Sequence, residues 1–266
     1  MDELRVIGVG LWLPGVPNVE AWQAGARGLT TQGQEYPAPT GLGIERRARR
    51  RAGPFSRALA DAFGMAATQA HIDVTQTSAV FGSALGEVST MLELLGQMHS
   101  DEPLSPMAFA TSVHSATAGV ISISAGNRGF TTSISANYDT VGATLLEAHG
   151  VLHALGAPVI VTCGDEASPA GFVDELEASD MLAVAIALAA PGSDAPVLAR
   201  LRGPHLGATD QGARVPAAEV SARMGRNPQV GLLDVVAAIL RGDTGEVSLD
   251  RGRGRGWCVT VLGACP

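Results

Sequence analysis

Hydrophobic residues gather in short runs separated by glycine, proline and polar residues, and five of these runs have the length of β-strands. They occupy residues 4–10, 77–83, 130–136, 157–162 and 181–189. Most are continuous rather than alternating, which is typical of strands that are buried on both faces. A further run at residues 257–262 predicts a closing strand near the C-terminus.

Apolar residues at helical spacing fill the segments between these strands. Residues 44–70 are rich first in arginine and then in alanine, and they predict one long helix. Residues 87–99 carry Val, Met and Leu near helical spacing, and residues 139–155 predict a helix directly after the third strand. A short helix at residues 19–26 and a buried helix within residues 107–126 complete the pattern.

Strands that alternate with helices indicate an α/β architecture. We predict a single domain over residues 1–266, with a mixed five-stranded sheet covered by helices, since no linker or internal repeat divides the chain. The stretch 203–227 is polar and contains glycine and proline, so we expect a long loop or insertion there.

Gly8-Val9-Gly10 at the end of the first run raises the question of a dinucleotide-binding site. The third glycine of the G-x-G-x-x-G pattern is replaced by Leu13, and Pro14-Gly15 stands where the phosphate-binding helix begins in such sites. We therefore exclude a Rossmann site and interpret the glycines as a turn that ends the strand.

The composition excludes several classes of function. All 18 basic residues are arginine, so Schiff-base sites and Walker-type phosphate sites, which need a lysine, are excluded. The net charge of −8 argues against non-specific nucleic-acid binding, which needs a cationic surface. Three cysteines without C-x-x-C spacing indicate neither a disulfide framework nor a zinc site.

Targeting signals are not recognised in the sequence. Asp2, Glu3 and Arg5 interrupt the start of the chain, so it does not read as a signal peptide. The longest apolar run, residues 181–190, has about half of the ~20 residues that a membrane-spanning helix needs. We expect a cytoplasmic protein with no membrane span, no cofactor and no metal.

Arginines cluster in two places. Residues 46–51 hold five of them, and residues 251–255 read Arg-Gly-Arg-Gly-Arg. RGG-like segments bind RNA, but this one is short and leads directly into the apolar run that begins at Trp257. We interpret it as a turn that leads into the last strand.

The sharpest turn from a strand into a helix spans residues 134–140, and active sites of α/β proteins usually lie at such turns. A side chain here stands beside the free N–H groups and the positive end of a helix, as the nucleophile does in a nucleophile elbow. The turn carries Asn137 and Tyr138, which are poor nucleophiles. The alternative is that Asp139 or Thr140 simply caps the helix.

Other polar groups give weaker signals. Ser83 lies in a glycine turn after the second strand, and Asp165 and Glu166 follow the fourth. His149 and His153 form an i, i+4 pair on one helix without a third ligand nearby, which favours a solvated or partner-facing pair over a metal site.

Four segments together carry a resemblance to a known family. They are residues 44–51 with the helix after them, the Val-Phe-Gly-Ser-Ala-Leu-Gly-Glu stretch 80–87, residues 105–119, and residues 129–148. Residues 105–119 are the most specific, because they resemble an S-P-x-x-F-x-x-S-V-H-N-A-x-A-G pattern with Ser115 in place of asparagine. Over roughly residues 1–190 the chain resembles the N-terminal half of β-ketoacyl-ACP synthases. The match is closer to a short ketosynthase-like family of aryl polyene and related pigment gene clusters.

This resemblance implies a thiolase-like fold with a truncated or reduced C-terminal half. A condensing ketosynthase carries its acyl chain on an elbow cysteine and uses two histidines and a lysine from that C-terminal half. Here the place of the cysteine falls on Asn137 or Tyr138, His205 is the only histidine beyond the fifth strand, and lysine is absent. The chain therefore resembles the non-condensing partner, a chain-length factor.

The resemblance also implies partners and site residues. An active ketosynthase would pair with the chain as a heterodimer or larger complex, and its acyl tunnel would end against this subunit. Acyl-carrier protein would be contacted indirectly, and a homodimer is possible when the chain is alone. No residue is implied to be catalytic. The residues implied to line the tunnel or interface are Phe109, Ser112, Val113, His114, Ser135, Asn137 and Tyr138.

Tyr138 would limit the length of a growing polyene by its bulk. For Phe109 and Val113, ordinary packing in the core of the chain is an equally good explanation.

Two further functions stay open. A stand-alone acyl-ACP or acyl-CoA hydrolase or decarboxylase on the same fold would use His114, Ser135 or Asp139. A scaffold would bind the acidic acyl-carrier protein through the arginines of residues 46–51, by an attraction that weakens with salt.

Overall fold

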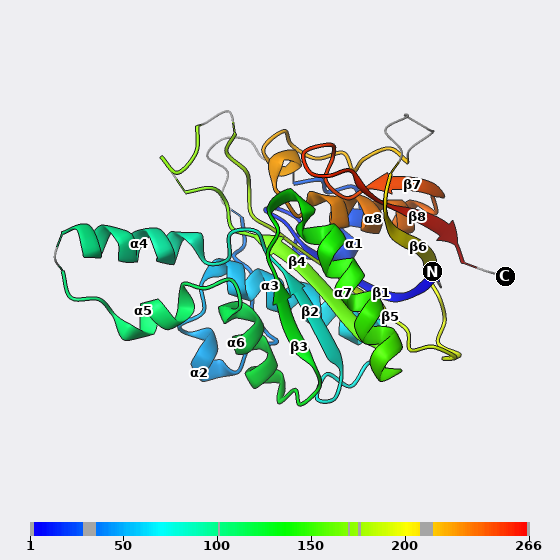
Figure 1. Ribbon diagram of the computed structural model, residues 1–266, viewed down its shortest axis with the longest axis horizontal. Helices are drawn as coiled ribbons and strands as arrows, with labels where there is room; N and C mark the ends of the chain where they lie inside the picture. Colours follow the sequence, from blue (N-terminus) through cyan, green and yellow to red (C-terminus); the bar gives the residue numbers. More distant parts are fainter. Residues whose placement is uncertain are drawn as a thin grey trace.

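The computed structural model describes residues 3–28, 36–100, 102–169, 171–174, 177–207 and 215–264, which form one sheet with helices on both faces (Figure 1). Eight strands lie in the order β3-β2-β4-β5-β1-β6-β8-β7. Their bounds are β1 Leu4–Trp12, β2 Ser78–Gly82, β3 Thr131–Ile134, β4 Val159–Asp165, β5 Leu182–Leu188, β6 Ala199–Leu206, β7 Gly245–Ser248 and β8 Trp257–Gly263.

The sheet is mixed, as the sequence predicts, but it has eight strands rather than five. β3, β2 and β4 run parallel to one another, and the other neighbouring pairs are antiparallel. The carboxyl ends of the three parallel strands therefore meet at the same edge of the sheet.

Helices cover both faces. Their bounds are α1 Val19–Gln23, α2 Arg46–Arg49, α3 Pro54–Gln69, α4 Val88–His99, α5 Pro106–Thr111, α6 Ala116–Ala125, α7 Thr140–Leu155 and α8 Val230–Arg241. α7 and α8 pack with the large side chains of β5, which alternate along the strand with alanines that face α3. Two hydrophobic cores result, one on each face of the sheet.

Gly10 explains how closely α3 approaches the sheet. A Cβ on Gly10 would lie 2.1 Å from the carbonyl oxygen of Ala62, so the backbones of β1 and α3 are in direct contact there. β1 continues through Gly10 to Trp12, and the interpretation of its glycines as a terminal turn is wrong. Two observations exclude a phosphate-binding loop at these glycines. The sequence lacks the third glycine of the pattern, and Gly10 is in close contact with α3.

The long helix predicted at residues 44–70 is broken into α2 and α3. Pro54 occupies the first turn of α3, where its missing N–H costs no hydrogen bond, and Gly53 precedes it in an extended conformation. The sequence nevertheless shows one continuous helical pattern, because small and charged residues that suit a helix stand on both sides of the break.

The C-terminal part contributes more to the sheet than the sequence predicts. β6, β7 and α8 were not anticipated, and residues 203–206 of the predicted loop belong to β6. Among the described residues of the rest of that stretch, residues 215–223 form neither helix nor strand. Residues 199–263 thus supply three strands at one side of the sheet, beyond β1.

α4 and α5 extend as an arm away from the sheet, on the side of β3 and α6 (Figure 1). Within the described part of the chain, no helix has the length and apolar character that crossing a membrane requires.

Candidate functional site

The carboxyl ends of β2 and β4 are joined by one buried carboxylate, that of Asp165 at the end of β4. It accepts hydrogen bonds from the Ser83 hydroxyl (2.6 Å), the Leu85 N–H (2.9 Å) and the Gln229 side-chain amide (2.8 Å). Burial raises the pKa of Asp165, and these donors oppose the rise. The turn after β2 is thereby fixed against β4, which makes Ser83 and Asp165 structural groups.

The elbow follows β3 as a 3₁₀ turn, Asn137–Asp139, that leads into α7. Asn137 has a φ of +52°, a left-handed conformation that few residues other than glycine and asparagine adopt readily. Its side chain is exposed. Asn137, rather than Tyr138, is therefore the residue at the strained apex of this turn.

Thr140 closes the elbow. Its hydroxyl accepts from the Ala136 N–H (2.9 Å) and donates to the Asn137 carbonyl oxygen (2.6 Å). Asp139 makes no side-chain cap on α7, so the simple capping role considered for it is wrong. Its Oδ1 accepts instead from the backbone N–H of Arg255, at 2.8 Å.

The loop of residues 250–256 joins β7 to β8 and lies over the elbow, and we call it the 250–256 loop. Asp250 fixes its shape by accepting from the N–H groups of Gly252 (2.8 Å) and Gly256 (2.7 Å). Arg251 is held by a two-pronged ion pair to Asp234 of α8, with N···O distances of 2.7 and 2.6 Å. This loop is indeed a turn that leads into the last strand, as the sequence predicts.

Arg253 reaches the elbow from this loop. One of its terminal nitrogens donates to the Tyr138 hydroxyl at 3.0 Å, and the guanidinium carbon lies 5.5 Å from the centre of the Tyr138 ring. The same nitrogen lies 3.4 Å from a carboxylate oxygen of Glu177. On α7, Gly142 leaves the space that the ring of Trp257 fills, since a Cβ there would lie 2.5 Å from that ring.

Cys163 packs below the elbow, against Gly82 of β2 and Thr144 of α7. It has no exposed surface, and burial raises the pKa of its thiol to about 12. Cys258 is also buried, and Cys265 lies outside the described residues. Cys163 is therefore no substitute for an elbow thiolate, because only the ionised thiol is a strong nucleophile.

A second buried group of acids lies at the base of α4. Glu87 accepts from the hydroxyls of Ser56 and Thr117, the latter at 2.9 Å, while Glu166 accepts from the Ser89 N–H at 2.8 Å. Burial raises the pKa of Glu166, and the neighbouring Glu87 adds to the rise. These bonds connect the base of the arm to α3, α6 and β4.

The remaining residues that the sequence singled out lie on and around the α5–α6 connection. Phe109 and Val113 are 67% and 45% exposed, so packing in the core of this chain does not explain them. The backbone of His114 lies against Gly86. The Ser112 hydroxyl donates to the Phe109 carbonyl oxygen at 2.9 Å, and that of Ser135 to the Ala84 carbonyl oxygen at 3.1 Å.

Four of the predicted residues therefore lie around the carboxyl ends of β2 and β3, namely Ser135, Asn137, Tyr138 and His114. Phe109, by contrast, points to solvent. His149 and His153, the pair considered as metal ligands, form a ring contact with centroids 4.5 Å apart on α7.

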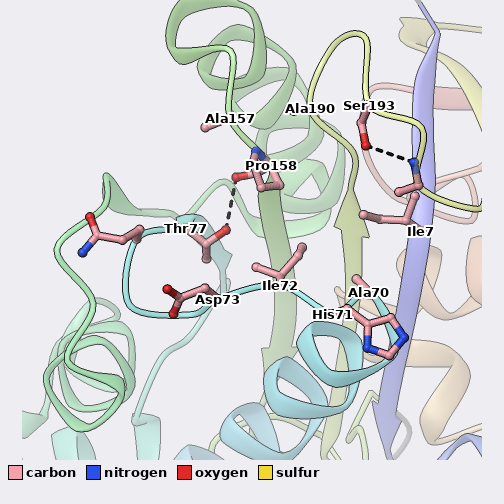
Figure 2. Close-up of a pocket in the computed structure, with 12 residues that line it drawn as sticks. Ile7, Ala70, His71, Ile72, Asp73, Thr77, Ala157, Pro158, Ala190 and Ser193 are labelled. Carbon is pink, nitrogen blue, oxygen red and sulfur yellow. Dashed lines mark hydrogen bonds between the residues drawn. The ribbon is translucent and has the colours of Figure 1, made fainter.

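Two pockets in the described part of the chain lie away from the elbow. One, of about 510 Å³, is lined by Thr77 and Pro158, which precede β2 and β4, so it lies at the opposite end of these strands (Figure 2). The Thr77 hydroxyl donates there to the Pro158 carbonyl oxygen at 3.3 Å. The other, of about 870 Å³, lies between α1, α3 and residues 37–43.

Arg253, Asp250 and Asp234 were missed as parts of the site. The Gly-Arg alternation of residues 251–255 was visible, but its position over the elbow depends on β7 and α8, which were not predicted. The signal that could have found it is the single buried acid of the otherwise apolar α8, Asp234, which needs a cationic partner.

Comparisons with known proteins support this fold. Residues 20–257 match the family model described as "Beta-ketoacyl synthase, N-terminal domain". No curated protein matches the chain.

Solved structures share the fold. One is a chain of "Ketosynthase (ApeO) in Complex with its Chain Length Factor (ApeC) from Xenorhabdus doucetiae", with a TM-score of 0.71, 20% identity, and coverage of 98% of this chain and 100% of that one. Another is a chain of the AntDE:AntF complex of a type II PKS acyl-carrier protein with its ketosynthase, with a TM-score of 0.69 and 14% identity over 99% of both chains. The ishigamide ketosynthase/chain length factor has a TM-score of 0.54 and 16% identity, over 75% of this chain and 62% of that one.

Proposed function

Because the chain belongs to the β-ketoacyl synthase family, we propose that it is a non-condensing, chain-length-factor-like subunit of an active ketosynthase. The observation that carries the proposal is the elbow: Asn137 occupies its strained apex, and the thiol packed below it is buried with a pKa of about 12. A side-chain amide forms no thioester with an acyl chain, so the covalent step of condensation has no acceptor at this elbow.

The alternative of a stand-alone thioester enzyme has less support from the geometry. Ser135 donates its hydroxyl proton to a backbone carbonyl oxygen, and Asp139 is bound to the 250–256 loop. A nucleophile needs a base within hydrogen-bond reach of its hydroxyl. Turnover of acyl-ACP or acyl-CoA by the purified chain would establish this alternative.

The surface that we assign to the ketosynthase is the arm together with the free edge of β3. Eight of the fourteen large apolar side chains exposed in the described part of the chain lie within residues 88–134. They are Leu95, Met98, Leu104, Met107, Phe109, Val113, Ile123 and Phe130. β3 is the edge strand beside them, and its outer side offers backbone groups for pairing with another chain.

In this complex the acyl tunnel of the ketosynthase ends against the elbow, and Tyr138 limits the length of its product. The structures of ketosynthases with chain length factors that share the fold support polyketide-type biosynthesis. From the resemblance of the chain we infer aryl polyenes as the product class, with fatty-acid-type chains as the alternative. The complex would assemble in the cytoplasm as a heterodimer or larger unit.

In the alternative of a scaffold, acyl-carrier protein would bind directly, through α2 and its flanks. Arg46, Arg47, Arg50 and Arg51 are exposed there. Carrier proteins are acidic, and charge complementarity of this kind speeds encounter and weakens with salt. A carrier-protein association that does not change between low and high salt would contradict this assignment.

The proposal is tested by co-expressing the chain with a full-length, cysteine-bearing ketosynthase from the same organism. We expect the two to co-purify and the product profile of the ketosynthase to depend on the pairing.

Phe109→Glu should abolish co-purification, because it buries a charge in the interface. The matched control Leu206→Glu changes an exposed leucine on β6, far from β3 in the sheet, and should leave the complex intact. A ketosynthase whose activity and product length are the same without this chain would overturn the proposal.

A further inference from the structure

We propose that Arg253 is a positioning residue for Tyr138, and that the 250–256 loop thereby sets the chain length of the product. The inference rests on the proposed function, in which Tyr138 ends the acyl tunnel. It adds a residue 115 positions further along the sequence as a second determinant of length.

The contacts of Arg253 fix the Tyr138 ring in two ways. The hydrogen bond of 3.0 Å holds the hydroxyl, and the guanidinium lies over the ring at 5.5 Å, within the range of a cation–π contact. The ring of a partly exposed tyrosine otherwise moves between rotamers. A bulky side chain ends a tunnel at a defined depth only if it keeps one rotamer, so these contacts decide how sharply the length is set.

The loop is rigid enough to act as the support. Asp250 closes it from within by accepting two of its N–H groups. Arg251 anchors it to Asp234, which is 2% exposed and also accepts from the Ala218 N–H at 2.7 Å. Removal of Arg251 would leave the buried Asp234 carboxylate without its cationic partner, so this ion pair holds the loop against α8.

The 250–256 loop is also hydrogen-bonded to the elbow itself, through Asp139. The Arg255 N–H donates to the Asp139 carboxylate, directly after Tyr138 in the sequence. Gly254 lies so close that a Cβ on it would be 2.6 Å from Asp139 Oδ1. Tyr138 is therefore held from Asp139 on its backbone side and from Arg253 on its side-chain side.

The experiment uses the complex with the ketosynthase and four variants: Arg253→Met, Arg253→Lys, Tyr138→Phe and Tyr138→Ala. We expect Tyr138→Ala to lengthen the product. Arg253→Met keeps the apolar stem and loses the charge, and should raise the ratio of longer to normal product by about two- to fivefold, the effect of losing an exposed cation–π contact. Arg253→Lys restores the cation and should recover most of the normal profile. Tyr138→Phe keeps the ring under the guanidinium and should have a smaller effect than Arg253→Met.

A double-mutant cycle separates positioning from a general effect on folding. In the Tyr138→Ala background, Arg253→Met should have no further effect on product length, because the ring that it positions is absent. A second readout needs no partner. The chain has two tyrosines, so ring-labelled protein gives two sets of tyrosine NMR signals, and Tyr138→Phe identifies those of Tyr138. Arg253→Met should shift or broaden these signals and leave those of Tyr36 unchanged.

The outcomes distinguish the two proposals. If Tyr138→Ala lengthens the product while Arg253→Met changes neither the product nor the Tyr138 signals, the positioning role is wrong and the proposed function stands. If the chain does not bind the ketosynthase, the proposed function fails and the length-setting role of Arg253 fails with it. Additive effects of the two substitutions would also overturn the inference, since independent residues do not share one route.

Discussion

Cys163 illustrates how the environment of a residue, rather than its type, decides its chemistry. A cysteine in a ketosynthase-like chain invites a catalytic role, but this one has no exposed surface and a pKa of about 12. The chemistry of this elbow is decided in the same way by Asn137, whose residue type tolerates the positive φ of the apex without supplying a nucleophile.

Cys163 should therefore resist alkylation in the folded protein. In a Cys265→Ser background, we expect no label on Cys163 or Cys258 after incubation with iodoacetamide at pH 8, because both are buried. In guanidinium chloride both should be labelled completely. Mass spectrometry of the intact protein measures the number of labels. Labelling of native Cys163 at the rate of a free thiol would contradict the buried geometry.

The buried carboxyl group of Glu166 makes the stability depend on pH. Burial raises the pKa of Glu166, so the native state binds this proton more tightly than the unfolded state does. The resulting contribution to stability is complete below the pKa of an unfolded glutamate and is lost as the pH rises through the native pKa. Glu166→Gln keeps the acceptor for Ser89 and removes the titration. It should raise the Tm at pH 8 by about 2–4 °C, equivalent to about 1 kcal/mol at this size, and leave it unchanged near pH 4.

Asp165→Asn is the matched control, because the pKa of Asp165 is also raised by burial. Both Asp165 carboxylate oxygens accept hydrogen bonds, among others from Ser83, Leu85 and Gln229. The asparagine side chain would turn its NH2 group, which cannot accept, toward one of these donors. We expect a loss of about 1–3 kcal/mol in the free energy of unfolding. Thermal and urea unfolding between pH 4 and 9 measure both variants. A Glu166→Gln protein less stable than wild type at pH 8 would show that Glu166 is needed as a carboxyl group.

At the level of elements, the sequence predicts those whose pattern is local. β1, β2, β3, β4, β5, β8, α1, α4 and α7 lie close to their expected positions. β6 was missed because Gly203 and Pro204 interrupt its alternating pattern, and β7 because it has only four residues. Pairing with β8 stabilises both strands, and such non-local pairing leaves no local signal.

The candidate site divides in the same way. The elbow was predictable because strand, turn and helix follow one another within residues 130–155. The contact between Arg253 and Tyr138 was not predictable, because it joins the 250–256 loop, directly before β8, to the turn directly before α7. The exposure of Phe109 was not predictable either. An aromatic residue in an apolar stretch gives the same sequence pattern whether it packs in the core of this chain or against a partner.

Asp234 on α8 should stabilise the 250–256 loop. Asp234→Ala leaves the Arg251 guanidinium and the Ala218 N–H without their acceptor, and should cost about 2–4 kcal/mol in the free energy of unfolding. Asp234→Asn keeps an acceptor oxygen and should cost less. Chemical denaturation measures the two variants. The arrangement described for the loop would be wrong if Asp234→Ala were as stable as wild type.

At the level of the whole molecule, the two sides of the sheet differ in character. On one side β6, β8 and β7 end the sheet as antiparallel strands, while on the other β3 ends it beside the exposed apolar side chains of residues 88–134. Exposed apolar patches of this kind mark interaction surfaces in soluble proteins. The chain thus has a surface suited to association, while its overall net charge of −8 opposes non-specific aggregation.

Without its partner, this surface should associate with a second copy of the same chain. A two-fold dimer would place the same patch of each copy against the other and pair the two β3 edges. We expect a concentration-dependent dimer in size-exclusion chromatography with light scattering. Ile123→Arg puts a charge at a position on α6 that is 83% exposed in the single chain, and should give a monomer with an unchanged Tm.

Leu42→Arg, at another highly exposed leucine outside residues 88–134, should leave the dimer intact. Added ketosynthase should then convert the homodimer into the mixed complex, because both assemblies use the same face. A homodimer that binds the ketosynthase without dissociating would separate the two surfaces, and the assignment of β3 and the arm to the ketosynthase would have to be abandoned.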